Sequence, residues 1–346
     1  MKAVHQDAVG RGPIKQAAAR ARGRLAIVAD PLTATRYAPA VRRSCAAAGL
    51  EATIVRVARG ERAKTAPSLA RSWNALAAAK IGRDGGVIAL GGGSVGDLAG
   101  FAAATYLRGV RLAQVPTTLL AMVDSSIGGK TGIDLAQGKN LAGAFHQPDA
   151  VLADPAVLGS LPRRERSSGL AEIVKSAFLV DRDSVTQIER SVAAVLDGDL
   201  GPTLGAIALA VDVKAGIVAT DEREAGLREL LNFGHTLGHA YEAARRYRVT
   251  HGEAVSIGLV FAAALADVLD LAPTSLRERL EALLGSAGLP TRAKLPAATW
   301  RFLRQDKKAR AGAVRWILPR TVGRFSEVVD VAPRAIRAAT AIVEGR

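Results

Sequence analysis

Between Arg24 and Asp154 the sequence alternates short β-like runs with longer Ala-rich stretches, and no other feature constrains the fold as strongly. β-like runs separated by helical stretches predict a parallel sheet with crossover helices. The expected strands are Leu25–Ala29, Thr53–Val57, Val87–Leu90, Leu112–Val115 and Val151–Ala153, and helices such as Thr33–Gly49 and Ser68–Ile81 are expected between them. The N-terminal half is therefore expected to be an α/β domain.

After Leu161 the apolar spacing is that of helices almost throughout. The expected helices are Gly169–Val180, Pro202–Ala219, Leu227–Arg246, Glu253–Asp270 and Ser275–Gly288, and only Val314–Leu318 suggests a late strand. We therefore expect two domains, an α/β domain over residues 1–160 and a mostly α-helical domain over residues 161–346.

Composition narrows the choice of partner and compartment. The net charge of +15 comes from the two ends of the chain, and Phe, Trp and Tyr total only 14, which disfavours a nucleic-acid binder. The single cysteine, Cys45, excludes an internal disulfide and a cysteine-rich metal site. Met1–Gly10 lacks the apolar stretch of a signal peptide, and the uncharged run Ala254–Ala266 is too short to span a bilayer. We expect a soluble cytoplasmic protein that does not bind a membrane.

A glycine-rich turn follows the expected strand at Val87–Leu90. Gly91, Gly93 and Gly96 fit the pattern G-x-G-x-x-G at the start of a helix. Such glycines let backbone N–H groups approach a pyrophosphate at the positive end of the helix dipole. The ribose-binding carboxylate expected about 20 residues later is missing, so it would have to come from elsewhere, such as Asp30 or Glu61.

A second glycine run, Gly128–Gly132, includes Gly-Gly-Lys-Thr and resembles the end of a P-loop. The full P-loop pattern requires glycine at position 124, where this chain has Asp124, which argues against a nucleotide hydrolase. The segment 124–132 is instead expected to be a loop that offers hydroxyls, backbone N–H groups and the Lys130 ammonium to an anionic ligand.

Three of the five histidines lie within 17 residues, at His235, His239 and His251. On a helix, His235 and His239 would share one face, as in H-x-x-x-H metal sites. With no cysteine nearby, this group suggests a divalent metal held by imidazole and carboxylate, with zinc as the first choice. The spacing leaves open whether both paired histidines are ligands or one is a general acid/base; histidines satisfied by hydrogen bonds in the core remain the alternative.

Glu172 is the carboxylate candidate, in the otherwise apolar stretch Gly169–Phe178. Lys175 lies three residues later and faces the same way on a helix. A surface ion pair would be the plain interpretation, but the apolar neighbours on both sides favour a buried, functional pair.

Taken together, six stretches of the chain resemble the 3-dehydroquinate synthases of the sugar-phosphate cyclase family. They are Gly91–Gly100, Pro116–Lys130, Gly138–Asn140, Gly169–Lys175, Leu231–His239 and His251–Glu253, and the resemblance runs from about residue 56 to 325. It implies an N-terminal dinucleotide-binding domain, a helical metal-binding domain, a cleft holding NAD and a divalent metal, and a homodimer. The metal would be zinc, with cobalt as the alternative.

Carried over position by position, the resemblance assigns roles to individual residues. It makes Glu172, His235 and His251 the metal ligands and leaves His239 as an acid/base group that contacts substrate. Around NAD it places Glu61, Lys64, Gly92, Gly93, Asp97, Thr117, Thr118, Asp124, Lys130, Lys139 and Ser160, the last standing where threonine is usual. Substrate contacts would come from Arg108, Lys130, Asn140, Lys175, Lys214, Arg228, Asn232 and Lys307, with Lys308 as the alternative to Lys307.

The implied reaction converts 3-deoxy-D-arabino-heptulosonate 7-phosphate to 3-dehydroquinate and phosphate, in the shikimate route to chorismate and the aromatic amino acids. It runs through transient oxidation by NAD, phosphate elimination, re-reduction, ring opening and intramolecular aldol closure. A cluster of Lys and Arg suits a phosphorylated sugar acid, because charge-assisted hydrogen bonds are stronger than neutral ones.

Three rival functions remain open. A metal-dependent alcohol or glycerol dehydrogenase would share the glycine turn, but it would not explain the segment 124–130 or the Lys and Arg cluster. A sister cyclase would act on an amino-substituted substrate or form a valiolone, although Asn232 and His239 favour the dehydroquinate branch over the valiolone branch. A non-catalytic nucleotide-binding relative is disfavoured by the intact Lys130, Lys175 and histidines.

Overall fold

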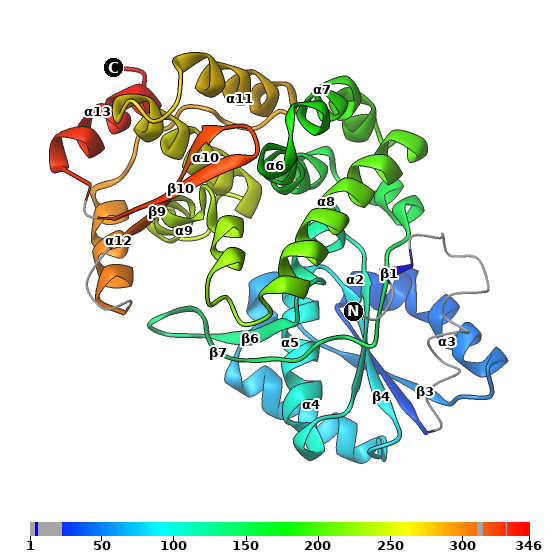
Figure 1. Ribbon diagram of the computed structural model, residues 1–346. Coiled ribbons are helices and arrows are strands. Elements are labelled where there is room, and N and C mark those ends of the chain that lie inside the picture. The colour runs from blue at the N-terminus through cyan, green and yellow to red at the C-terminus, as the bar shows by residue number, and fades with distance from the viewer. Residues whose placement is uncertain (1–3, 6–22, 310–313, 330) are drawn as a thin grey trace. The chain divides into compact units, whose positions relative to one another are not determined.

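The computed structural model describes residues 4–5, 23–309, 314–329 and 331–346. Two compact units follow one another along the chain, unit 1 from Met1 to Leu161 and unit 2 from Pro162 to Arg346. Unit 1 is an α/β unit built on a parallel sheet, and unit 2 is mostly helical (Figure 1). The predicted fold class is therefore confirmed.

Six parallel strands form the sheet of unit 1, in the order β1-β8-β5-β4-β2-β3. All five predicted strands are present to within one residue at each end. The strands are β1 (Val4–His5), β2 (Leu25–Ala29), β3 (Ala52–Arg56), β4 (Gly86–Gly91), β5 (Arg111–Pro116) and β8 (Ala150–Leu152). The strand order reverses around β2, and in sheets of this kind ligands bind beyond the carboxyl ends of the strands at such a reversal.

Helices cover both faces of this sheet. Because side chains alternate between faces along a strand, Ala26 and Val28 pack against α4 and α5, whereas Ile27 and Ala29 pack against α2 and α3. The helices are α2 (Pro31–Arg36), α3 (Ala38–Ala47), α4 (Ala66–Ala78) and α5 (Gly93–Thr105). Unit 1 also contains the 3₁₀ turns η1 (Gly60–Ala63), η2 (Tyr106–Arg108) and η4 (Pro155–Ser160). Each fully buried Val or Leu in these two cores contributes about 1.5–3 kcal/mol.

Two details of unit 1 differ from the sequence-based expectation. The single helix predicted over 33–49 is divided into α2 and α3, because Pro39 lacks an N–H donor and is tolerated only in the first turn of the new helix. The loop predicted over 124–132 is instead a turn of π-helix, η3 (Ala121–Ser125), followed by the strand β6 (Lys130–Leu135). β6 pairs in antiparallel fashion with β7 (Gly138–Phe145).

Unit 2 is organised around one buried helix, α10 (His251–Val268), which packs against α6, α9, α11, α13 and β9. The other elements are α6 (Arg163–Val180), α7 (Arg182–Asp197), α8 (Leu200–Thr220), η5 (Leu227–Asn232), α9 (His235–Ala244), α11 (Thr274–Ser286), α12 (Ala297–Ala309), β9 (Arg315–Thr321), β10 (Arg324–Val329) and α13 (Pro333–Glu344). Two of the helices, α8 and α10, are long and apolar enough to cross a membrane by length and composition. In α10 78% of the apolar window is buried inside the protein, as in the core helix of a soluble protein.

Unit 2 also corrects two expectations. The helix predicted over 227–246 breaks at Gly234, whose φ of +79° is a left-handed conformation that glycine adopts readily, so α9 begins at His235. A second late strand, β10, pairs with β9, although only one strand was predicted there.

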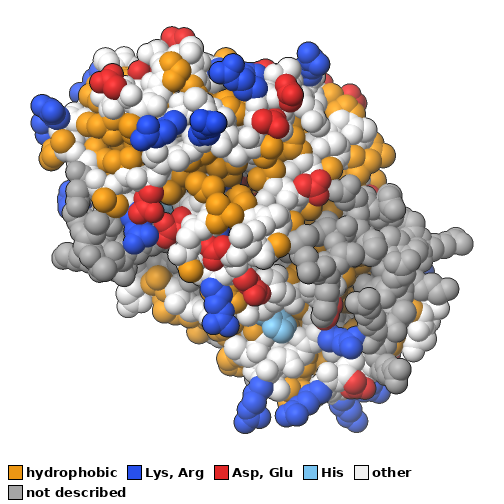
Figure 2. All heavy atoms as spheres, viewed as in Figure 1, with side chains coloured by type: hydrophobic (Ala, Val, Ile, Leu, Met, Phe, Trp, Pro, Cys, Tyr) orange, Lys and Arg blue, Asp and Glu red, His pale blue; other side chains and the backbone are white. Residues whose placement is uncertain are grey.

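Charged side chains are mixed on the surface. Figure 2 shows Lys and Arg interspersed with Asp and Glu over much of one face, with several Lys and Arg along its lower edge. Several of them pair, as Arg163 does with Asp197 and Arg279 with Glu189.

Candidate functional site

Glu172, His235 and His251 come from three different helices of unit 2 and converge on one point. The Nε2 atoms of His235 and His251 lie 3.2 and 3.0 Å from Glu172 Oε1. One potential ligand atom from each of the three residues lies within 4.8 Å of the others. The three residues that the resemblance assigned to metal binding are therefore brought together by α6, α9 and α10.

The start of each helix explains this convergence. His235 is the first residue of α9, and His251 is the first residue of α10, whose Thr250 cap forms a reciprocal capping box with Glu253. α10 touches α6 at the next residue, where Gly252 N–H donates to Ser168 Oγ at 3.0 Å. Since Glu172 lies one helical turn after Ser168 on α6, this contact places its carboxylate opposite His251.

The protonation states follow from the neighbours. Burial alone would raise the pKa of Glu172, but the charges of Lys175 and His235 hold it well below its usual value. Burial lowers the pKa of His235, and the Lys175 charge lowers it further. For His251 burial acts in the same direction, but hydrogen bonds with Glu172 and Glu242 outweigh it and raise the pKa to about 10.

The donor set fits a divalent cation. His235 Nδ1 lies 3.1 Å from the Phe233 carbonyl oxygen, so a proton on Nδ1 has an acceptor when Nε2 gives its lone pair to a cation. Two imidazole nitrogens and a carboxylate oxygen are the three-ligand set of many catalytic zinc sites, which keep a fourth position open.

Lys175 fixes the carboxylate of Glu172. Lys175 is 1% exposed, and its ammonium lies 2.5 Å from Glu172 Oε2 and donates to the Leu231 carbonyl at 2.9 Å. A buried ammonium must be paired to be tolerated, and these two acceptors supply the pairing. The predicted buried pair on α6 is therefore present in this structure.

His239 lies one turn after His235 on α9. Its ring centroid lies 5.1 Å from that of His235 and 6.0 Å from that of His251, and its side chain is exposed within the described residues. Desolvation in this crowded cluster and the charges of His235 and His251 lower the pKa of His239. His239 therefore borders the cluster as a neutral, accessible imidazole.

The other predicted residues of unit 2 lie on α8, η5 and α12. Arg228 is 1% exposed and donates to the Glu222 carbonyl, while Asn232 Nδ2 donates to Glu224 Oε1 at 2.9 Å. Lys214 is buried on α8. The backbone of Lys307 belongs to α12, but its side chain lies outside the described residues, as does that of Lys308.

In unit 1 the predicted glycine turn joins β4 to α5. Gly92 caps α5 without a side chain, so its backbone is open to close approach, and a Cβ there would meet Thr118 at 3.2 Å. Thr117 N–H donates to the Gly91 carbonyl at 2.9 Å, which joins the ends of β4 and β5. Asp30, the alternative ribose acid, instead caps α2 by accepting from Leu32 N and Thr33 N.

Lys64 is the centre of a charged network beside this turn. Its ammonium is 2.8 Å from Asp97 Oδ2, 3.6 Å from Asp134 and 3.8 Å from Glu61, and it also donates to Asn140 Oδ1. Burial favours the neutral amine, but these carboxylates outweigh it and raise the pKa of Lys64. Burial also raises the pKa of Asp97, against the opposing charge of Lys64.

The remaining predicted residues of unit 1 are more dispersed. Lys139 Nζ donates to Glu61 Oε1 at 2.8 Å, which joins both to the Lys64 network. Ser160 Oγ lies 2.8 Å from the Tyr37 hydroxyl. Asp124 lies in the π-turn η3, and the side chains of Lys130 and Arg108 are exposed within the described residues.

Family models match most of the chain. The 3-dehydroquinate synthase N-terminal family matches residues 54–168, and the corresponding C-terminal family matches residues 169–309. The chain belongs to the 3-dehydroquinate synthase family. The family match covers both the Lys64 network and the cluster of Glu172, His235 and His251.

Individual relatives agree with this family. The 3-dehydroquinate synthase of Symbiobacterium thermophilum is 47% identical over 318 residues, which cover 91% of this chain and 89% of that protein. Two solved cyclases share the fold of this 3-dehydroquinate synthase family member, and their cofactors are those that the resemblance implied. The 2-epi-5-epi-valiolone synthase of Streptomyces hygroscopicus subsp. jinggangensis, solved with NAD⁺ and Zn²⁺, is 28% identical (TM-score 0.90) and covers 100% of this chain and 98% of its own. A 2-deoxy-scyllo-inosose synthase complexed with carbaglucose-6-phosphate, NAD⁺ and Co²⁺ is 25% identical (TM-score 0.87) and covers 97% and 96%.

A more distant likeness shows the fold alone. Glycerol dehydrogenase from Schizosaccharomyces pombe is 14% identical to this 3-dehydroquinate synthase family member, with a TM-score of 0.69 and coverage of 100% and 92% of the two chains. The dehydrogenase of the rival interpretation thus shares a related architecture with this chain, but its sequence identity is much lower than that of the synthases.

Sequence reasoning missed two carboxylates in this 3-dehydroquinate synthase family member. Glu224, with a φ of +60°, accepts from Asn232, and Glu242 on α9 lies 3.6 Å from His251 Nδ1. A signal for Glu242 was present, because residues seven apart share a helix face and Glu242 follows His235 by seven. Glu224 had no such signal, since it lies in an irregular segment.

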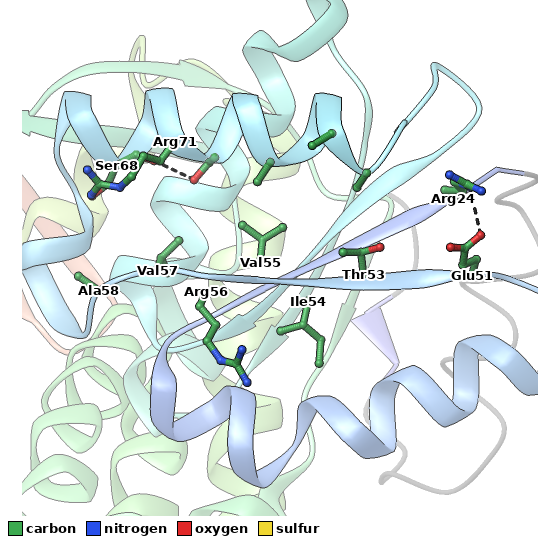
Figure 3. Close-up of a pocket in the computed structure, with 14 residues that line it drawn as sticks. Arg24, Glu51, Thr53, Ile54, Val55, Arg56, Val57, Ala58, Ser68 and Arg71 are labelled. Carbon is green, nitrogen blue, oxygen red and sulfur yellow. Dashed lines mark hydrogen bonds and ion pairs between the residues drawn. The ribbon is translucent and has the colours of Figure 1, made fainter.

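A groove of about 580 Å³ in unit 1 lies apart from these residues. Figure 3 shows it between the edge strand β3 and α4, with Arg24 paired to Glu51 and Arg71 donating to Ser68. None of the predicted site residues whose side chains the structure describes lines it.

Proposed function

We propose that this chain is a 3-dehydroquinate synthase that converts 3-deoxy-D-arabino-heptulosonate 7-phosphate to 3-dehydroquinate and inorganic phosphate. The observation that carries the proposal is the convergence of Glu172, His235 and His251 beside Lys175 in a chain that is 47% identical to a synthase of that name. The enzyme would be a carbon–oxygen lyase acting on phosphates. It would serve the shikimate route to chorismate and the aromatic amino acids.

Residues of unit 2 would hold the divalent cation, zinc or cobalt, and move a proton. When bound, NAD accepts and returns a hydride, and the cation stabilises negative charge that develops on substrate oxygens. Glu172, His235 and His251 hold the cation, and Lys175 keeps the Glu172 carboxylate ionised and fixed in place. His239, neutral and accessible, accepts a proton from a substrate hydroxyl on an imidazole nitrogen and returns it later.

Cationic and amide side chains would bind the two anionic groups of the substrate. Arg228 and Lys214 are buried, and charge-assisted hydrogen bonds to a carboxylate or phosphate are stronger than neutral ones. The donors assigned to substrate are Arg108, Lys130, Asn140, Lys175, Lys214, Arg228, Asn232 and Lys307. Placement of one substrate through every step gains on the order of 7–11 kcal/mol over the same groups free in solution.

The first unit would bind NAD. Gly92 and Gly93 open the helix α5 toward the pyrophosphate, and the Lys64 network supplies polar groups beside them. The residues assigned to NAD are Glu61, Lys64, Gly92, Gly93, Asp97, Thr117, Thr118, Asp124, Lys130, Lys139 and Ser160.

Replacing Asp97 by alanine is expected to weaken NAD binding by about tenfold or more, because it removes a charge-assisted hydrogen bond worth about 1.5–3 kcal/mol. Zinc content should stay unchanged, since the cation is assigned to residues of unit 2. Titration with NAD and metal analysis of the same sample measure both. Glu51→Ala, which breaks the exposed Arg24 pair in the same unit, is the matched control. Equal loss of NAD and zinc binding would indicate a folding defect and count against the assignment.

Zinc binding to the metal-free protein is expected to release about one proton per ion near pH 8. In the metal-free state His251 is protonated, because its pKa is about 10, whereas the lowered pKa values leave His235 neutral and Glu172 ionised. The zinc affinity should therefore rise about tenfold for each unit by which the pH is raised, up to about pH 10. Calorimetry in buffers of different ionisation enthalpy measures the release, and a value near zero would contradict it.

The activity itself is tested by phosphate release from heptulosonate 7-phosphate, with and without a chelator. Chelator-sensitive phosphate release without accumulation of NADH is the expected result. Stoichiometric NADH with a small alcohol would instead favour a dehydrogenase. Faster turnover of the amino-substituted analogue would favour a sister cyclase over the dehydroquinate branch.

The family resemblance also supports a homodimer located in the cytoplasm. Sedimentation of the purified protein at twice the monomer mass of 35.9 kDa is the expected result, and a monomer would contradict it.

A further inference from the structure

Glu242 is a buried carboxylate that the proposed function has not used. It is 6% exposed and lies on the face of α9 that also carries His235 and His239. A carboxylate is costly to bury unless a partner compensates for the lost hydration, so its neighbour is informative.

That neighbour is His251. The ring of His251 lies between two carboxylates, with Nε2 3.0 Å from Glu172 Oε1 and Nδ1 3.6 Å from Glu242 Oε2. An imidazole that coordinates a metal through one nitrogen carries its proton on the other, and an acceptor there fixes both the tautomer and the ring orientation.

His235 provides an internal comparison. The acceptor for its Nδ1 is the backbone carbonyl of Phe233, which no substitution at that position removes. His251 faces a side chain in the equivalent role, so its orienting partner can be tested by mutation.

The backbone of His251 is held by other contacts. Three contacts hold the first turn of α10. They are the capping box of Thr250 and Glu253, the bidentate pair of Arg164 with Glu253 at 2.8 Å, and the Gly252–Ser168 hydrogen bond. What these contacts leave undetermined is the rotation of the His251 ring, and Glu242 lies where it restricts that rotation.

We propose that Glu242 is a positioning residue that orients His251 for metal coordination, because its carboxylate attracts the Nδ1–H of that ring from 3.6 Å. The inference rests on the proposed function, because it takes His251 as a ligand. Glu242 itself does not touch the cation or the substrate in this role. Removal of a carboxylate that orients a metal-binding histidine typically lowers metal affinity by about 10–100-fold.

The test compares zinc affinity in a graded series, measured by competition with a chelating indicator. Glu242→Ala is expected to lower the affinity about 10–100-fold. Glu242→Gln should lie between Ala and the unsubstituted protein, because its amide oxygen still faces Nδ1–H but carries no charge. In Co²⁺-loaded protein, the visible absorption bands of both variants should shift, because they report on ligand geometry. A role in stability alone would move neither readout.

Controls separate this effect from misfolding. Glu281→Gln, which removes a carboxylate paired with Arg277 at 2.7 Å on α11, should leave zinc affinity unchanged. If Glu242→Ala does not fold, the nearly isosteric Glu242→Gln still carries the test through thermal melts and zinc titration of the same sample. The proposal is overturned if zinc affinity and cobalt spectra are unchanged in Glu242→Gln and in any Glu242→Ala protein that folds.

The outcome is distinguishable from failure of the proposed function. If the unsubstituted protein releases phosphate and the Glu242 variants bind zinc normally, only the positioning role is wrong. If the unsubstituted protein and its Glu242 variants bind zinc in the expected graded order but the unsubstituted protein releases no phosphate, the positioning role stands and the assigned reaction is wrong.

Discussion

Replacing His235 by alanine abolishes turnover in the proposed scheme, because two remaining ligands hold a cation poorly. Four-ligand zinc sites bind with about 10–16 kcal/mol, or about 3 kcal/mol for each ligand, so the loss of one should weaken zinc binding by about 100-fold or more. Equilibrium dialysis followed by metal analysis gives the affinity, and the phosphate-release assay gives the turnover. The fold should survive, since Lys175 still pairs with Glu172 after the imidazole is gone.

His146→Ala is the control for this variant. His146 belongs to unit 1, where its Nε2 lies 2.9 Å from the Val110 carbonyl, and it has no assigned role in metal binding. Zinc content should be the same as in the unsubstituted protein. Full zinc content and activity in the His235 variant would refute the metal assignment.

Gly252→Ala is expected to have the second large effect, on both stability and zinc binding. A Cβ at this position would lie 2.1 Å from the Ser168 carbonyl oxygen and 2.5 Å from its Cα, and neither backbone atom can rotate away. α6 and α10 must therefore separate, which should lower the free energy of unfolding by about 3 kcal/mol. Separation of these helices also moves Glu172 away from His251, so zinc affinity should fall together with stability.

Gly285→Ala provides a matched control, because nothing lies within 4 Å of a Cβ built on that glycine of α11. The same substitution there should raise the free energy of unfolding by about 0.4–1 kcal/mol. Urea denaturation of the metal-free proteins measures both changes. Equal stability of the two variants would mean that the α6–α10 contact is not as tight as described.

Much of the fold could be predicted because local signals agreed with the final structure. The strands of the parallel sheet are apolar runs bounded by turns, and β2 and β4 stand out in this way. The hairpin β6–β7 did not stand out as an apolar run, because Gly132 and Gly143 face each other across it with no room for side chains. Glycine is depleted in most strands, so the usual β signal was absent.

The candidate site was predictable to a different degree at each residue. His235 and His239 share a helix turn, and Glu172 is an acid among apolar residues, so both signals lie within a few positions of the chain. The sequence could not decide between His235 and His239 as the ligand, because the decision depends on α10 bringing His251 toward one of them. Spacing along α9 places Glu242 on the face of His235, but its contact with His251 joins two helices and cannot be predicted from that spacing.

The bond from the Lys175 ammonium to the Leu231 carbonyl has a consequence for attempts to alter substrate choice. Leu231 lies between Arg228 and Asn232, so the segment assigned to the sugar acid is tied to the side chain that steadies the Glu172 carboxylate. Redesign of that segment for a new substrate would disturb cation retention as well. Variants selected for altered preference should therefore be screened for bound metal before any loss of rate is attributed to poor substrate recognition.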